Sequence, residues 1–136
     1  MLRLATILVL SLFCRAIVAD AAVNHNFAAS WFRMSEGARV TWLWGAAEGQ
    51  SLVLEELPIA AKKKLENHLP FDKADVLARV ITSLYADPAN SYIPWKYMAV
   101  VANSKLNGAT ESEVAKRLEL LRQYTAYELQ KLRGDK

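Results

Sequence analysis

The chain has very few of the residues that carry catalysis or bind metals. Cysteine occurs once, at Cys14, and histidine twice, at His25 and His68, among 136 residues. A zinc site needs several Cys or His ligands at short spacing, and a Ser-His-Asp site needs a nucleophile motif such as G-x-S-x-G. Neither pattern is present. We therefore expect no metal and no cofactor, and we interpret both histidines as solvated side chains.

A strong charge of either sign is also lacking. The sequence has 17 basic and 14 acidic residues, and its basic residues form no long stripe. Proteins that bind nucleic acid cluster basic residues against the phosphates, so we expect no nucleic acid partner. The short run Lys62–Lys64 is interpreted as the wet side of a helix, with an acidic partner or a membrane surface as the alternative.

The chain has one long apolar run, and it lies near the N-terminus. Arg3 precedes the apolar segment Ala5–Cys14, and Ala19–Ala21 provides a small-x-small cleavage site. This layout is typical of a cleavable secretory signal peptide, here residues 1–21. The apolar run is only about ten residues long, whereas a spanning helix needs about 20. We expect a periplasmic or secreted protein with no stable membrane insertion after cleavage.

Removal of the leader would leave residues 22–136 as a single domain. Cys14 lies in the leader, so the mature domain has no disulfide and depends on packing for its stability. The full sequence is 53% hydrophobic and contains four Trp and five Tyr residues, which makes that packing rich in aromatic side chains. The mature net charge is +2, because Arg3, Arg15 and Asp20 belong to the leader.

Apolar periodicity predicts a first helix from about Asn26 to Gly49. One face of this helix repeats at spacings of three and four residues: Phe27, Trp31, Met34, Ala38, Trp42 and Gly45. Small residues recur every four positions on another part, at Gly37, Thr41, Gly45 and Gly49. An interior glycine costs about 1 kcal/mol relative to alanine. We therefore expect a second helix to pack closely against this glycine groove.

Residues 50–71 have a less regular pattern. Ser51–Leu57 is interpreted as a short strand or an irregular connection. Pro58 can begin a helix that continues over Ile59–His68, since proline is tolerated in a first turn. Leu69 and Pro70 would end it.

The C-terminal half predicts three further helices. Asp72 is the expected N-cap of a helix that Asp87-Pro88 ends, and Ala86–Ile93 has turn composition. Pro94 begins the next helix, and Asn107-Gly108 ends it. Thr110–Glu113 is a capping box for a long last helix, with an apolar repeat at Val114, Leu118, Leu121, Thr125, Leu129 and Leu132. The fold class is all-α, a small helical bundle of about four main helices.

The aromatic residues suggest where partners bind. Trp42 and Trp44 lie about 160° apart on a helix, so one of them must face solvent, another helix or a partner. Tyr92, Trp95 and Tyr97 surround the Pro94 helix start. They either cover the end of the bundle or form a contact surface, because Tyr and Trp are enriched at interface hot spots. Tyr92 and Trp95 are our candidate partner-binding residues.

Two stretches resemble the Rap/Tai-type immunity proteins of bacterial type VI secretion. Trp42–Gly49 is similar to their aromatic-x-x-Gly-x-x-acid-Gly pattern, and Val76–Tyr85, Asp87-Pro88 and Trp95–Leu106 resemble their order of helix, turn and helix. The resemblance implies an all-helical periplasmic protein that blocks a secreted toxin. The chain departs from the family because those proteins usually have paired cysteines. Its last helix is also longer than the resemblance explains.

Three function classes follow. The first is an exported protein-binding module without enzymatic activity, with immunity to a toxin as its most concrete form. The second is an assembly factor of an envelope complex, in which the long last helix pairs with its own copy as a homodimer or with another protein. The third is a small hydrolase that uses carboxylates near Glu55, Glu56 and Asp87.

We predict cleavage after Ala21 or within one or two residues of it. The intact mass of the protein recovered from the periplasm measures this directly. A product that begins at Met1, or one that behaves as an integral membrane protein, would contradict the signal-peptide interpretation.

Overall fold

The computed structural model describes residues 25–55 and 69–134. The expected leader lies outside these residues. So do Pro58, His68 and the helix expected over Ile59–His68, which includes Lys62–Lys64.

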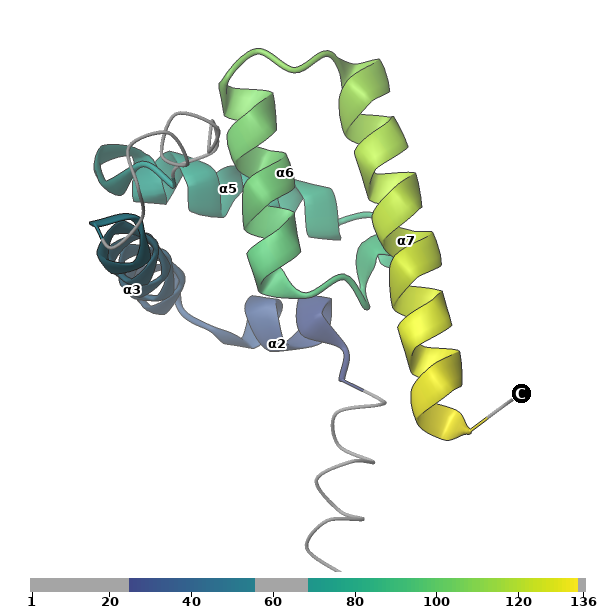
Figure 1. Ribbon diagram of the computed structural model, residues 1–136. Coiled ribbons are helices and arrows are strands. Elements are labelled where there is room, and N and C mark those ends of the chain that lie inside the picture. Colours follow the sequence, from purple (N-terminus) through teal and green to yellow (C-terminus); the bar gives the residue numbers. More distant parts are fainter. Residues whose placement is uncertain (1–24, 56–68, 135–136) are drawn as a thin grey trace, which may run out of the picture.

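The described residues are helical and contain no strand, which confirms the all-α prediction. Figure 1 shows α6 and α7 side by side and antiparallel, with α5 crossing α6 and α3 near the outer end of α5. The arrangement only roughly matches a four-helix bundle, because five α-helices and two 3-10 turns are present in the described ranges. They are α2 (Phe27–Arg33), α3 (Glu36–Glu55), η1 (Phe71–Lys73), α5 (Ala74–Tyr85), η2 (Pro88–Asn90), α6 (Trp95–Leu106) and α7 (Glu111–Arg133).

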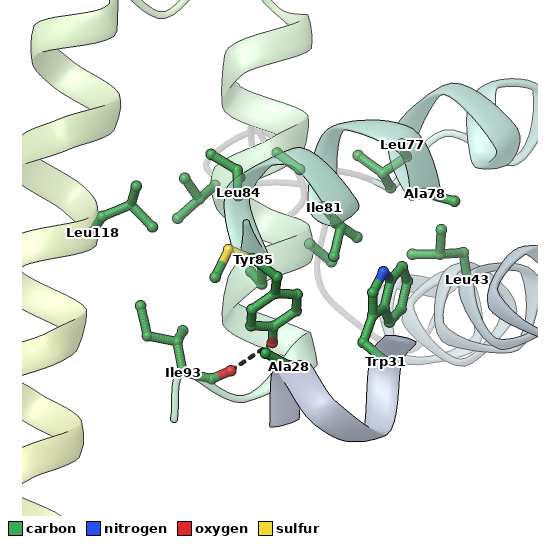
Figure 2. Packing of buried hydrophobic residues seen from close by; sticks show 14 of the residues in the cluster. Ala28, Trp31, Leu43, Leu77, Ala78, Ile81, Leu84, Tyr85, Ile93 and Leu118 are labelled. Atoms are coloured by element: carbon green, nitrogen blue, oxygen red, sulfur yellow. Dashed lines mark hydrogen bonds between the residues drawn. The ribbon is translucent and has the colours of Figure 1, made fainter. Parts of the chain in front are cut away.

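Helix α5 occupies the centre of the core and packs against both α3 and α6. Its apolar face is buried at Leu77, Ile81 and Leu84 (Figure 2). Tyr85 ends this helix, and its hydroxyl donates a 2.6 Å hydrogen bond to the carbonyl oxygen of Ile93. Burial raises the pKa of Tyr85, so the phenol keeps the proton that this bond needs.

The prediction of one helix from Asn26 to Gly49 was wrong. Met34 has an extended backbone with ψ of 142°, and it separates α2 from α3. The hydroxyl of Ser35 then accepts a 3.2 Å hydrogen bond from the amide of Ala38 near the start of α3. The periodicity of the apolar residues continues across the break and therefore concealed it.

Arg39 satisfies the end of α2 from the first turns of α3. Its guanidinium donates to the carbonyl oxygens of Trp31 at 2.9 Å and of Phe32 at 3.3 Å. These carbonyls lie in the last turn of α2, where the amide partners four residues on are absent. The Trp31 carbonyl also accepts from the amide of Met34 at 3.2 Å. The break therefore leaves no unfavourable unpaired carbonyl at these two positions.

Ser51–Glu55 belongs to α3, so the expectation of a strand or an irregular connection there was wrong. An existing helix extends at little cost through leucine and glutamate, and no proline interrupts it before Pro58. Residues 56 and 57 lie outside the described residues. Gln50 on the same helix accepts a 2.9 Å hydrogen bond from the amide of Leu69, where the described chain resumes.

The expectation of a helix packed on the glycine groove is not met by the described residues. Gly37, Gly45 and Gly49 are all exposed, and a Cβ added at any of them would meet no described atom within 4 Å. The break at Met34 also means that α3 buries Leu43 and Ala47 and turns the glycines outward.

The helix ends in the C-terminal half agree with the sequence except at α5. Asp72 lies inside η1, and the N-cap position of α5 is Lys73, which makes no side-chain capping bond. Pro94 precedes α6, and Gly108 follows it with φ of 90°. The Thr110 capping box forms, and the backbone and side-chain hydrogen bonds of Thr110 lower the pKa of Glu113.

We predict that Gly45→Ala raises the free energy of unfolding by up to about 1 kcal/mol, because the position is helical and open. Gly108→Ala is the matched control and should destabilise the protein, because its positive φ strains any residue with a Cβ. Thermal denaturation followed by circular dichroism measures both. A destabilising Gly45→Ala would indicate that a helix does pack on this row.

Candidate functional site

The side chains that could bind a metal ion are dispersed over the described residues. No cluster of three His, Cys, Asp or Glu side chains occurs among them. Asp87 forms an ion pair with Arg122 at 2.7 Å and accepts a hydrogen bond from the amide of Ala89. The side chain of Glu55 and all of Glu56 lie outside the described residues. His25 packs edge-on against Phe27.

The polar groups around η2 instead form a clamp on α7. Arg122 donates to the Oδ1 atom of Asn90 at 3.0 Å as well as to Asp87. Asn90 is buried, and its amide donates at 2.7 Å to the carbonyl oxygen of Leu84 at the end of α5. We call Asp87, Asn90 and Arg122 the Arg122 clamp. It joins α5, η2 and α7 through charge-assisted hydrogen bonds.

The Arg122 clamp holds the turn that carries Tyr92. Ile93 on one side of Tyr92 is buried, and Ser91 on the other side accepts a 3.1 Å hydrogen bond from the amide of Ala28. Tyr92 itself is 47% exposed. A large ring is therefore displayed on a backbone that is fixed on both sides.

Tyr92 borders a hollow of about 210 Å³ between the turn and α7, which we call the Tyr92 hollow. Apolar side chains dominate its lining, and Arg122 and Thr125 are its polar members. The lining residues are Ala89, Tyr92, Ile93, Arg122, Thr125, Ala126 and Leu129. The hydroxyl oxygen of Thr125 is buried and has no hydrogen-bond partner among the described residues.

Trp95 does not share this exposed surface, so only one of the two candidate partner-binding residues lies on it. The indole nitrogen of Trp95 donates at 2.8 Å to the carbonyl oxygen of Phe27. Its ring meets those of Trp31 and Trp42 edge-on at centroid distances of 6.0 and 5.4 Å. Trp95 thus covers the core, whereas Tyr92 faces solvent. Trp44 is 49% exposed, in agreement with the expected divergence of Trp42 and Trp44.

A second apolar surface lies on the other side of α7, in the groove between α6 and α7. It encloses about 300 Å³ and is lined by Tyr97, Val100, Val101, Arg117, Leu120 and Leu121. Tyr97 and Tyr124 meet edge-on at 6.1 Å beside it. The Glu128 carboxylate and the hydrogen bond with Tyr97 raise the pKa of Tyr124.

The predicted apolar repeat of α7 describes only its inner face. Val114 and Leu118 are buried, while Leu121, Thr125 and Leu129 are half-buried and Leu132 is 59% exposed. Sequence reasoning missed a second repeat, at Leu120, Tyr124 and Tyr127, which we call the outer stripe. Its spacing of four and three residues was readable in the sequence.

Comparison of the chain with protein-family models, with curated proteins and with solved structures gave no match. Within the described ranges, no helix has the length and apolar character needed to span a membrane. The case for function therefore depends on the surfaces described above.

We predict a large loss of stability at one candidate residue and almost none at the other. Trp95→Ala should lower the free energy of unfolding by about 2–4 kcal/mol, because it removes ring contacts and leaves the Phe27 carbonyl unpaired. Tyr92→Ala should change it by less than about 0.5 kcal/mol, as is usual for an exposed position. Chemical denaturation measures both, and equal effects would show that the two rings share one environment.

Proposed function

We propose that this protein is an exported, non-enzymatic binding module that recognises another protein through Tyr92 and the Tyr92 hollow. The observation that supports this most strongly is the half-exposed Tyr92 ring on a turn fixed by the Arg122 clamp. Tyrosine and arginine are enriched among interface hot spots. A preordered turn also reduces the entropy lost when a partner binds.

The size of the hollow favours a protein partner over a small-molecule ligand. Ligand pockets typically enclose about 300–1,000 Å³, and the Tyr92 hollow encloses about 210 Å³. That volume suits one protruding side chain of a partner. Thr125 and Arg122 give its wall a polar part.

The predicted leader and the resemblance to immunity proteins favour one version of this function. A periplasmic module that blocks a secreted toxin needs a rigid contact surface and no catalytic residues of its own. Neutralisation of a toxin or enzyme in the periplasm is therefore the form that we propose.

Site-specific photo-crosslinking tests the surface in the cells that make the protein. A photoreactive amino acid in place of Tyr92 should give a discrete adduct with one other protein, which mass spectrometry identifies. The same amino acid in place of Trp44 is the matched control, because Trp44 is equally exposed and lies on α3, away from η2 (Figure 1).

Affinity measurements with the identified partner complete the test. Tyr92→Ala should weaken binding about thirtyfold, equivalent to ~2 kcal/mol, with an unchanged melting temperature. The proposal fails if position 92 gives no adduct, or if Tyr92→Ala binds as tightly as the unmodified chain. Hydrolysis of a peptide or peptidoglycan by the purified protein, lost in Glu56→Gln, would favour the hydrolase alternative.

A further inference from the structure

The outer stripe of α7 faces away from the core. Tyr127 follows Leu118 by nine residues, or two and a half helical turns, so the two point in opposite directions. Leu120 is 56% exposed, Tyr124 is 48% exposed and Tyr127 is 61% exposed. The groove beside α6 continues this surface through Tyr97 and Val100. This surface is on the other side of α7 from the Tyr92 hollow, so a partner bound at the hollow would not cover it.

The outer stripe is symmetric about the middle of its own helix. Helix α7 runs from Glu111 to Arg133, so Arg122 is its central residue. Leu120 and Tyr124 lie two residues on either side of that centre. If a second copy of α7 lies antiparallel with its centre at the same level, Leu120 of each copy meets Tyr124 of the other. The two helices then overlap along their full length of about 35 Å.

On either side of this apolar centre, the same alignment brings complementary side chains together. Arg117 and Tyr127 lie five residues from Arg122, so each guanidinium meets the partner's tyrosine ring, a favourable cation–π pair. Glu113 and Lys131 lie nine residues from it, so each carboxylate meets an ammonium group. Lys131 has no acidic partner among the described residues, and both side chains are exposed.

The residues of these pairs occupy the successive a and d positions of one heptad repeat. Glu113, Arg117, Leu120, Tyr124, Tyr127 and Lys131 follow one another at spacings of four and three residues. In an antiparallel coiled coil, each a position of one helix faces a d position of the other helix. The register proposed here has this arrangement. Moving the two-fold axis to the level of Tyr124 would instead place Arg117 against the partner's Lys131. The charges therefore select one register.

The surface is also held ready for such a contact. Arg117 donates a 2.5 Å hydrogen bond to the hydroxyl of Ser104 on α6, and Tyr124 packs against Tyr97. Less side-chain freedom is lost on binding when the residues are already ordered.

We propose that the occupant of the outer stripe is a second copy of this chain, bound as a symmetric antiparallel α7–α7 pair with its two-fold axis beside Arg122. The exposed apolar repeat and its charge complementarity carry this inference, which does not depend on binding at Tyr92.

Sedimentation velocity of the protein, purified as the cells process it, tests the proposal over a concentration series. We expect a reversible dimer. Leu120→Glu should raise its dissociation constant by about a hundredfold, because each dimer would then bury two carboxylates among apolar groups. Tyr124→Glu should act in the same way. Lys131→Glu should weaken the dimer several-fold, with a smaller effect in high salt.

Ala115→Lys is the control variant, because Ala115 is exposed on the opposite side of α7 and also gains a charge. It should leave dimerisation unchanged. Circular dichroism should be retained in every variant, since all the altered positions are exposed. The melting temperature should be retained at protein concentrations at which the unmodified chain is monomeric, because association itself stabilises the folded state. A protein that stays monomeric, or a dimer that tolerates both Leu120→Glu and Tyr124→Glu, overturns the proposal.

Disulfide trapping tests the register separately. In a Cys14→Ser background, chains with Leu120→Cys and chains with Tyr124→Cys are mixed and oxidised mildly. The three disulfide-linked products are distinguished by mass. Antiparallel pairing about Arg122 should favour the mixed disulfide over both homodimeric ones. Predominant Leu120→Cys homodimers would show a parallel arrangement or a different axis, and would overturn the inferred geometry.

Discussion

The packing of α2, α3 and α5 depends on the anchoring of Trp31. This residue is fully buried, and its indole nitrogen donates a 2.9 Å hydrogen bond to Thr82 on α5 (Figure 2 shows the ring against α5). Its carbonyl oxygen accepts from Arg39 on α3, and the Arg39 guanidinium also lies over its ring. One side chain and its own peptide group thus join three helices. The hydrogen bonds matter because an unpaired buried indole or carbonyl costs about 1–3 kcal/mol.

Sequence reasoning succeeded where local chemistry decides the structure. The Thr110 capping box, Pro94 and Gly108 fix helix ends through bonds or backbone angles that involve only a few neighbouring residues. It failed at Met34 and along the glycine row, where distant contacts decide. The break after α2 is stabilised by Arg39, whose guanidinium reaches two carbonyl oxygens of α2 from the first turns of α3. Apolar spacing alone does not report such a contact.

The candidate surface was predictable only in part for the same reason. The composition of Ala86–Ile93 indicated a turn with aromatic residues, but not which ring would be buried. Trp95 is held inward because Phe27 offers it a carbonyl oxygen. Tyr92 is left outside because Ile93, its neighbour, fills the core. Arg122 belongs to the candidate site because it bonds to Asn90, a residue distant in sequence. No local sequence pattern could therefore have identified Arg122 as a site residue.

The sparse burial of α7 has a thermodynamic consequence for recognition. Beyond Leu118, no side chain of α7 is fully buried, and the Arg122 clamp ties this part of the helix to η2. Such an element opens locally at a lower free-energy cost than the core does. The Tyr92 hollow and the outer stripe both require this same stretch to be helical. Ligation at either proposed surface would therefore stabilise the helix for the other, and linkage would make that positive cooperativity reciprocal.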